Sequence, residues 1–387
     1  MPPTPIRVLH VITGLHTGGA ETMLCKLVTG NGADGIGHAV LSLGVPGPVG
    51  ARMVEAGIRV HTLGMRGLMP LPTHVARLRR ITAAERPHVI HGWMPHGNLA
   101  ASSASLGRAV PVIWGIRQSL YDLAYERPTT RLVIRLAARW SRHPARIVYN
   151  SHSGAEHHEA LGYDRSRTLV IPNGFDTDAF TPSAEHRRAV RAELGISEDA
   201  IVIGMVARYD PMKDHGNLLQ AAARLARERP DVHYVLAGRG VDETNAVLVD
   251  GRAGAGLSAR MHLLGERADT ARLFAACDVA VLTSYTEGFP NVLGEAMACG
   301  TPCVSTAVGE ASWIVGETGR VVPPRDPDAL ADGMRWILAL GAEQRRALGA
   351  AARRRIQSTY GLAAVRGQYA RLYREIAGSI RPRDPGT

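Results

Sequence analysis

The sequence predicts an α/β protein with two doubly wound parallel sheets. The chain has 387 residues, which exceeds one ordinary domain and suits two of roughly 190 residues. Hydrophobic residues make up 45% of it, enough for two buried cores. Short, almost continuously apolar runs alternate with segments of helical periodicity. This alternation is typical of parallel strands that helices cover on both faces.

The first series of this alternation is expected to form an N-terminal Rossmann-like domain over residues 1–172. Its expected strands are Ile6–Ile12, His38–Leu43, Val60–Leu63, Val89–His91, Val110–Ile113, Ile147–Tyr149 and Leu169–Ile171. Its expected helices are Ala20–Thr29, Val75–Glu85, Thr129–Arg142 and Ser153–Leu161.

A concentrated turn signal, Pro172-Asn173-Gly174-Phe175-Asp176, ends this series. A second Rossmann-like domain is expected over residues 173–360. Its expected strands are Ile201–Ala207, Val232–Ala237, Met261–Leu264, Val279–Thr283 and Cys303–Ser305. Its expected helices are His215–Arg229, Thr270–Cys277, Val292–Cys299 and Asp326–Gly341. We expect the two domains to face each other across a cleft, with ligands at the carboxyl ends of the strands. Periodicity leaves open whether the last helix, Leu362–Ile376 within residues 361–387, returns to the first domain.

Composition excludes several classes of protein. The four cysteines form no C-x-x-C pair, so neither a disulfide scaffold nor a zinc ribbon is indicated. No apolar run approaches the ~18–20 residues of a membrane span. The start, Met1–Pro5, leads straight into a strand without the pattern of a signal peptide. We therefore expect a cytoplasmic protein.

The positive charge of the chain is unevenly distributed. Lysine and arginine number 45 against 35 acidic residues, a net charge of +10. Residues 1–172 contain 19 of these basic and 9 of these acidic residues, so the whole excess lies in the first domain. Aromatic residues are only 5% and do not interleave with the basic ones as a nucleic-acid stacking surface requires. We therefore expect no nucleic-acid partner, and an anionic membrane surface or acceptor instead.

The expected helix Thr129–Arg142 concentrates this charge beside an apolar stripe. Two parallel rows recur every four residues: Arg131, Arg135, Arg139 and Leu132, Leu136, Trp140. Such a helix is suited to lie on anionic lipid at the inner face of the cytoplasmic membrane. The alternative is a solvated helix whose apolar stripe packs on the sheet.

Two segments are suited to bind phosphate. Gly18 and Gly19 lead from the first strand into a helix, where a close backbone and free N–H groups favour an anion. Lys213 is one of only two lysines in a chain that otherwise uses arginine. Its compact ammonium, with Arg208 five residues earlier at a strand end, is suited to clamp a pyrophosphate. A plain strand–helix turn and two surface cations remain as the alternatives.

A third segment supplies carboxylates. Glu287 lies in the loop after Val279–Thr283, and Glu295 lies on the next helix. One carboxylate is suited to accept hydrogen bonds from sugar hydroxyls, and the other from a ribose diol. A structural pair of surface glutamates is the alternative. Together the three segments describe a site for a nucleotide diphosphate that carries a sugar.

Motifs over nearly the whole chain resemble those of the retaining GT-B glycosyltransferases of the group 1 (GT4) family. They are Gly18-Gly19-Ala20-Glu21, His91-Gly92-Trp93-Met94-Pro95-His96-Gly97-Asn98, Ile171-Pro172-Asn173-Gly174, Arg208 with Lys213-Asp214, and Glu287-Gly288-Phe289-Pro290-Asn291 with Glu295-Ala296-Met297-Ala298-Cys299-Gly300-Thr301-Pro302. The resemblance implies a metal-independent transfer from a nucleotide sugar, with no cofactor and with the anomeric configuration kept.

The resemblance also implies roles for individual residues. Arg208 and Lys213 hold the pyrophosphate, and Glu287 binds the donor sugar. Glu295 binds the ribose. The residues whose backbone groups contact the donor phosphate or sugar are Gly18, Gly19, Phe289, Pro290 and Asn291.

Two positions depart from the family pattern. The frequent H-x-H at the end of the fourth strand is His91-Gly92-Trp93 here, and Arg117 stands where many members carry a histidine. Arginine stays protonated and cannot act as a base. Arg117 is therefore expected to stabilise the leaving phosphate or to bind an anionic acceptor, and the leaving phosphate itself can accept the proton. Glu287, Arg117 and His91 are the candidate catalytic residues.

Metal binding has weak candidates. D-x-D pairs occur at Asp176 with Asp178 and at Asp326 with Asp328, but the first follows a turn and the second opens a helix. A run of histidines, His152, His157 and His158, is expected to form a solvated or partly packed helix face. No metal site is expected.

These observations predict a glycosyltransferase that uses a UDP- or GDP-type donor. The expected acceptor is a glycan or lipid-linked sugar in the synthesis of a surface polysaccharide such as lipopolysaccharide. Two alternatives remain: a sugar-nucleotide epimerase with the same layout, and a basic-surface binding protein with a degenerate cleft. Intact Lys213, Glu287 and Glu295 disfavour the second alternative.

Overall fold

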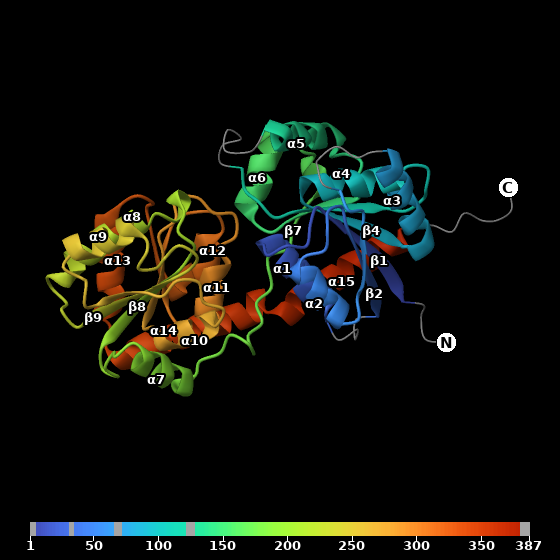
Figure 1. The fold of residues 1–387 in the computed structure, drawn as a ribbon. Coiled ribbons are helices and arrows are strands. Elements are labelled where there is room, and N and C mark those ends of the chain that lie inside the picture. The colour runs from blue at the N-terminus through green and yellow to red at the C-terminus, as the bar shows by residue number, and fades with distance from the viewer. Residues whose placement is uncertain (1–4, 31–34, 66–71, 121–127, 380–387) are drawn as a thin grey trace, which may run out of the picture. The chain divides into compact units, whose positions relative to one another are not determined.

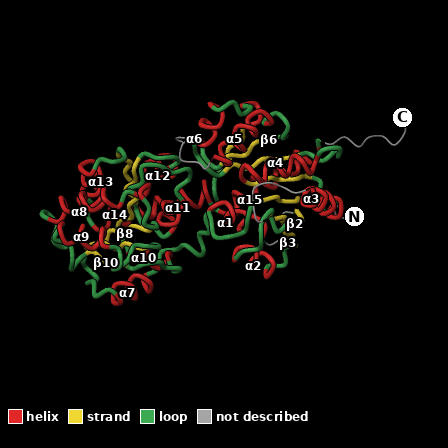
Figure 2. Tube along the Cα trace, turned by 45° about the horizontal axis from the view of Figure 1, so that its top comes forward, coloured by secondary structure: helices red, strands yellow, loops and turns green. Residues whose placement is uncertain are grey.

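The computed structural model describes residues 5–30, 35–65, 72–120 and 128–379. The chain forms two compact units, one of Met1–Gly174 with Ala363–Thr387 and one of Phe175–Leu362. Each unit contains a parallel sheet with helices on both faces (Figures 1 and 2), which confirms the predicted fold class. The start that precedes the first expected strand, residues 1–4, and the end of the expected C-terminal segment, residues 380–387, lie outside the described residues.

The first unit has a seven-stranded sheet in the order β3-β2-β1-β4-β5-β6-β7. Its strands are β1 (Ile6–Ile12), β2 (Ile36–Ser42), β3 (Arg59–Thr62), β4 (Val89–Trp93), β5 (Val112–Ile116), β6 (Arg146–Tyr149) and β7 (Thr168–Val170). Its helices are α1 (Gly19–Val28), α2 (Pro48–Glu55), α3 (Pro72–Glu85), α4 (Met94–Ser105), α5 (Pro128–Trp140), α6 (His152–Ala160) and the C-terminal α15 (Leu362–Gly378). In register, Ile6 of β1 pairs with Ile36, and Val8 pairs with Val89 of β4.

The side chains of β1 alternate between the two faces of this sheet, as a strand buried on both sides requires. Leu9 and Val11 join an apolar core with residues of α3, α4, α5 and α6. His10 points to the opposite face, where its ring lies 6.1 Å from that of Tyr373 on α15. Helix α15 is tied to α1 on that face, because the Arg366 guanidinium donates to the carbonyl of Lys26 at 3.0 Å.

The second unit has a six-stranded sheet in the order β10-β9-β8-β11-β12-β13. Its strands are β8 (Ile201–Val206), β9 (Val232–Ala237), β10 (Met261–Leu263), β11 (Val279–Leu282), β12 (Cys303–Thr306) and β13 (Gly319–Val322). Its helices are α7 (Ala184–Glu193), α8 (His215–Ala226), α9 (Ala246–Gly254), α10 (Thr270–Ala276), α11 (Asn291–Ala298), α12 (Ala311–Val315), α13 (Pro327–Ala339) and α14 (Ala342–Arg355).

Two apolar cores cover the faces of this second sheet. One joins β8, β9 and β11 to α8, α9 and α13, and the other joins β11 and β12 to α11, α12 and α14 (Figure 1). Helix starts carry the caps that their residues predict. Ser183 accepts a hydrogen bond from the backbone of His186 in α7, and Asp326 accepts one from Ala329 in α13.

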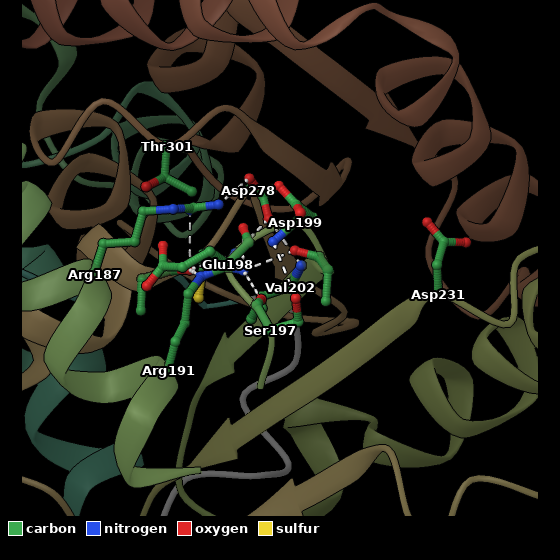
Figure 3. Close-up of polar contacts among 12 residues, drawn as sticks. Arg187, Arg191, Ser197, Glu198, Asp199, Val202, Asp231, Asp278 and Thr301 are labelled. Carbon is green, nitrogen blue, oxygen red and sulfur yellow. Dashed lines mark hydrogen bonds and ion pairs between the residues drawn. The ribbon is translucent and has the colours of Figure 1, made fainter. Parts of the chain in front are cut away.

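A buried arginine ties α7 to the amino ends of β8 and β11. The side chain of Arg191 is 1% exposed, and its guanidinium donates to Asp278 at 2.8 Å. Arg187 donates to the same carboxylate at 3.0 Å, and Figure 3 shows both arginines reaching toward it. Further bonds from Arg191 reach the carbonyls of Ser197, Glu198, Ala200 and Ala276. All three nitrogens of the Arg191 guanidinium donate to the Asp278 carboxylate or to backbone carbonyls, so we assign this group a structural role.

Several elements were not expected from the sequence, namely strand β13 and helices α2, α4, α7, α9, α12 and α14. Strand β13 was not expected, because it is a short run of four residues that is mostly not buried. Helix α4 was not expected either, because Pro95, His96 and Gly97 are poor helix formers. Tertiary contacts decide in both cases, since seven residues of α4 are buried and β13 pairs along its whole length with β12.

Candidate active site

The strand order of the second sheet reverses between β8 and β11. These neighbouring strands pair in parallel, with Ile203 of β8 opposite Val279 of β11. Ligands of doubly wound sheets bind at such a switch point, outside the carboxyl ends of the strands. Lys213 follows β8 and Glu287 follows β11, so topology places both at this point.

The loop after β8 is shaped by an aspartate. Asp210 caps a single 3₁₀ turn over Pro211–Lys213, accepting from the backbone of Met212 at 3.0 Å. The other carboxylate oxygen accepts from the Arg208 guanidinium at 3.0 Å. Burial alone would raise the pKa of Asp210, but the Met212 N–H and the Arg208 charge outweigh it and lower the pKa. Arg208 is 47% exposed, so its guanidinium keeps surface available for another anion.

Lys213 and Glu287 form an ion pair across the switch point. Their side chains are 18% and 14% exposed. The Ser284 hydroxyl donates to the same Glu287 oxygen at 2.7 Å. The Thr283 hydroxyl donates to the Lys213 carbonyl at 2.7 Å and ties the two loops together. These contacts therefore hold the residue expected to bind phosphate, Lys213, next to the residue expected to bind the sugar, Glu287.

Helix α11 begins directly after Pro290 and carries Glu295 one turn past Asn291. Gly294 lets this helix approach Phe175, because a Cβ there would lie 2.1 Å from that ring. The side chain of Phe289 is 7% exposed and stacks on Phe175 with centroids 6.1 Å apart. Phe289 therefore anchors the segment in the core, and its expected contribution to a ligand is backbone only. The backbone start of α11 offers N–H groups to an anion.

The strand order of the first sheet reverses between β1 and β4. Gly18, after β1, is the N-cap of α1 with φ −166°, an extended conformation that any residue adopts. As a glycine, Gly18 has no side chain with which to cap this helix start. Gly18 and Gly19 thus place uncapped backbone N–H groups at the switch point of the first unit.

His91 lies on β4 beside this switch point and is fully buried. Its Nδ1 lies 2.8 Å from the Tyr373 hydroxyl of α15. Burial, followed by the nearby Arg117 charge, lowers the pKa of His91 well below its ordinary value. The ring is therefore neutral at neutral pH, and its predicted catalytic role stays a prediction.

Arg117 follows β5, and three groups hold its side chain in place. Its guanidinium donates to the Asn173 amide oxygen at 2.6 Å and to the Tyr369 hydroxyl. The guanidinium carbon lies 5.0 Å from the centre of the Trp93 ring. In the described part of the chain, Arg117 forms no ion pair with a carboxylate.

The structure thus gathers the predicted residues into one cluster in each unit. Arg208, Lys213, Glu287 and α11 share the carboxyl edge of the second sheet. His91 and Arg117 share a tyrosine of α15, since the rings of His91 and Tyr369 lie 5.9 Å apart. The sequence analysis missed Tyr369 and Ser284 as supports, because no local pattern links either residue to its partner.

The alternative metal candidates have other roles. Asp176 accepts hydrogen bonds from the backbone of Asp178 and Ala179, and Asp326 caps α13. His158 is buried, with its Nδ1 2.8 Å from the Gly154 carbonyl, so this helix face is packed. Among the described residues, no group of three metal-ligating side chains is positioned to hold an ion.

Family models match both units of the chain. The model described as Glycosyltransferase Family 4 matches residues 17–179, and the model described as Glycosyl transferases group 1 matches residues 186–355. These models, with the two sheets, define a glycosyltransferase of the GT-B fold. The chain belongs to the group 1 (GT4) glycosyltransferase family.

Individual proteins are similar to the chain over different spans. A D-inositol 3-phosphate glycosyltransferase of Geodermatophilus obscurus is 40% identical over 210 residues, 50% of this chain and 44% of that protein. The chain thus matches less than half the length of this relative. Anabaena HepE in complex with UDP has a TM-score of 0.83 at 24% identity, covering 96% of this chain and all of that one. Sucrose-phosphate synthase from Thermosynechococcus elongatus has a TM-score of 0.77 at 22% identity, covering 97% of this chain and all of that one. The two structures show the fold.

Proposed function

We propose that the protein is a retaining, metal-independent glycosyltransferase. It moves a sugar from a nucleoside diphosphate donor of the UDP or GDP type to a glycan or lipid-linked acceptor in surface polysaccharide synthesis. The observation that carries this proposal is the Lys213–Glu287 pair at the switch point of the second sheet. A cation for phosphate and a carboxylate for hydroxyl groups stand side by side there.

The donor site follows from the chemistry of its side chains. Arg208 and Lys213 bind the pyrophosphate and stabilise the negative charge that grows on it as the bond from the sugar C1 to the phosphate oxygen breaks. Glu287 accepts hydrogen bonds from the sugar hydroxyls. Glu295, on α11, accepts those of the ribose, and the backbone at Asn291 binds phosphate.

The first unit supplies charge near the acceptor. Arg117 is always protonated, so it stabilises anions and cannot remove the acceptor proton. In the proposed reaction the acceptor oxygen attacks C1 on the face that the phosphate leaves, and the departing phosphate oxygen takes the proton. The new bond then has the configuration of the old one. A phosphate-bearing acceptor suits the excess positive charge of this unit, and the name of the Geodermatophilus relative includes a phosphorylated inositol.

A panel of nucleotide sugars tests the proposal. We expect at least one UDP- or GDP-sugar to raise the melting temperature of the full chain, equally with and without a chelator. The same compound should yield a glycosylated product whose anomeric configuration, determined by NMR, matches the donor. Conversion of the donor to its epimer without an acceptor, or activity that a chelator abolishes and a divalent cation restores, would contradict it.

We also propose that α5 binds an anionic membrane surface. The described residues include no helix both long and apolar enough to span a bilayer. Helix α5 packs on its unit through Ile134 and Ala137, which are buried. The apolar row faces solvent instead, with exposed fractions of 59% for Leu132, 44% for Leu136 and 48% for Trp140. The alternative in which this stripe packs on the sheet is therefore wrong.

Positive charge borders the exposed row. Arg135 and Arg139 are exposed on the same helix. At the C-terminal end of α5, a surface hollow of about 440 Å³ is lined by three arginines and one carboxylate, those of Arg139, Arg142, Arg165 and Asp164. Apolar side chains in such a row can enter the acyl region of a bilayer, while the neighbouring guanidinium groups lie level with the lipid phosphates. This arrangement supports binding to anionic lipid.

Vesicle sedimentation tests the lipid-binding face. We expect the protein to sediment with phosphatidylglycerol vesicles at low salt and to remain in solution with phosphatidylcholine vesicles. The triple change of Arg131, Arg135 and Arg139 to Gln should abolish sedimentation. The matched control changes the exposed Arg77, Arg79 and Arg80 of α3 to Gln, which removes the same charge and should leave most binding intact. Equal losses in both triple variants would show a non-specific charge effect and contradict the assignment.

A further inference from the structure

A hollow lies on the carboxyl edge of the second sheet, between the starts of α8 and α13. Its volume is about 380 Å³, and its lining is Asp214, Asn217, Gln220, Tyr285, Arg325 and Pro327. This volume falls in the range of about 300–1,000 Å³ that small-molecule sites occupy. None of these residues has a role in the donor site proposed above.

The wall of this hollow contains a buried amide with no bonding partner. Asn217, in the first turn of α8, is 3% exposed. Neither its side-chain oxygen nor its side-chain nitrogen has a hydrogen-bond partner among the described residues. A buried amide without partners destabilises a fold, which is why most are satisfied. Both amide atoms are shielded here, so a ligand that bonds to them and removes this cost requires the Asn217 side chain to turn toward the hollow.

Backbone strain gathers at the same place. Four non-glycine residues of the described chain have positive φ, and two of them, Asp214 at 47° and Arg325 at 58°, line this hollow. Residues held in this region are concentrated at ligand-binding and catalytic sites. The Arg325 guanidinium carbon lies 4.0 Å from the centre of the Tyr285 ring, which fixes the cation over the hollow's aromatic wall.

The lining selects a class of ligand. The single carboxylate of Asp214 and the single guanidinium of Arg325 cancel in formal charge, so the lining does not favour a net anion or cation. Only Tyr285 and Pro327 offer apolar surface. The amides of Asn217 and Gln220 can each donate and accept hydrogen bonds. Neutral molecules dense in hydroxyl groups match this set.

We propose that this hollow is a binding site for a neutral saccharide, distinct from the donor site. It lies beside that site, because Asp214 follows Lys213 and the Tyr285 N–H donates to the Met212 carbonyl at 3.1 Å. A bound glycan segment is therefore positioned close to the Lys213–Glu287 pair. The site adds to the proposed function, and its saccharide binding can be measured without transfer.

Saturation-transfer NMR on the full chain tests this site. The probes are maltotriose, α-1,4-linked galactotriose and chitotriose. We expect saturation of at least one probe, and a decrease of about fivefold in its affinity on Asn217→Leu, since the leucine cannot bond to hydroxyl groups. Asn217→Leu should also melt at a higher temperature than the wild type, because an unpaired amide has been replaced by an apolar group. Arg325→Ala, at an exposed residue, should weaken binding in a variant that keeps the core unchanged.

The donor variant Glu287→Ala separates the two sites, because Glu287 is the residue proposed to bind the donor sugar. Saccharide binding that is unchanged in Glu287→Ala and weakened in Asn217→Leu and Arg325→Ala supports the proposal. Binding lost only in Glu287→Ala would place the saccharide in the donor site and overturn it. Absence of saturation for all three probes would show that only water fills the hollow, and would overturn it as well. A failure of transfer with intact saccharide binding contradicts the proposed function alone.

Discussion

Lys213→Ala is expected to lower kcat/KM for sugar transfer by about a thousandfold, the effect of removing a group that stabilises charge in the transition state. The ammonium lies at the switch point, where it pairs with Glu287. In the reaction it neutralises the charge that develops on the donor pyrophosphate, and no other lysine is available in that unit. Initial rates of product formation with the donor identified by the panel measure this loss.

Two variants make the Lys213 result specific. Lys26→Ala changes the only other lysine of the chain and should leave kcat/KM unchanged. Lys213→Arg keeps the charge but changes its shape, so it should recover only part of the activity. Full activity in a folded Lys213→Ala protein would remove the donor-site assignment.

Arg117→Gln is expected to lower kcat/KM by about a hundredfold, since charge-assisted hydrogen bonds to phosphate are lost. Asn173, Tyr369 and Trp93 hold this guanidinium, and no carboxylate in the described chain neutralises it. We therefore expect the guanidinium to bind an anionic group of a substrate. Steady-state kinetics with varied donor and varied acceptor will show which substrate carries that anion.

A positioning role for Tyr369 gives the Arg117 assignment a second test. Tyr369→Phe removes the hydroxyl that fixes Arg117 and should lower kcat several-fold while KM for the donor changes little. Arg108→Gln removes an exposed arginine of the same unit and serves as the control. If Arg117→Gln and Arg108→Gln were equally active, Arg117 would be a structural residue.

The fold was predictable because its signals are local. Parallel strands buried on both faces are runs of apolar residues, and the run Val232–Ala237 predicts β9 with the bounds that the structure shows. Helix α4 was not predictable in this way, since its Pro95 and Gly97 disfavour a helix locally and packing against β4 and β5 overrides them. The exposure of Leu132, Leu136 and Trp140 was undecided for a related reason. Periodicity defines a stripe but does not say which stripe the unit buries.

In the candidate site, too, local features could be predicted and contacts between distant residues could not. Lys213 and Glu287 could be predicted from residue choice and from their place after strands. Their ion pair depends on β8 and β11 being neighbours, although they are separated by two other strands in sequence. The hydrogen bond between Arg117 and Tyr369 connects residues 252 positions apart, and no sequence motif predicts such a contact. The unpaired amide of Asn217 is visible only once burial is known.

Hydrogen–deuterium exchange with and without the nucleotide sugar tests the central claim most directly. The claim is that the donor binds at the carboxyl edge of the second sheet. We predict slower exchange in two segments, residues 207–215 after β8 and residues 284–295 at the start of α11. Lys213→Ala should abolish this protection at the same donor concentration. Protection confined to the opposite edge, around Arg187 and Asp278, or to the first unit alone, would contradict the account.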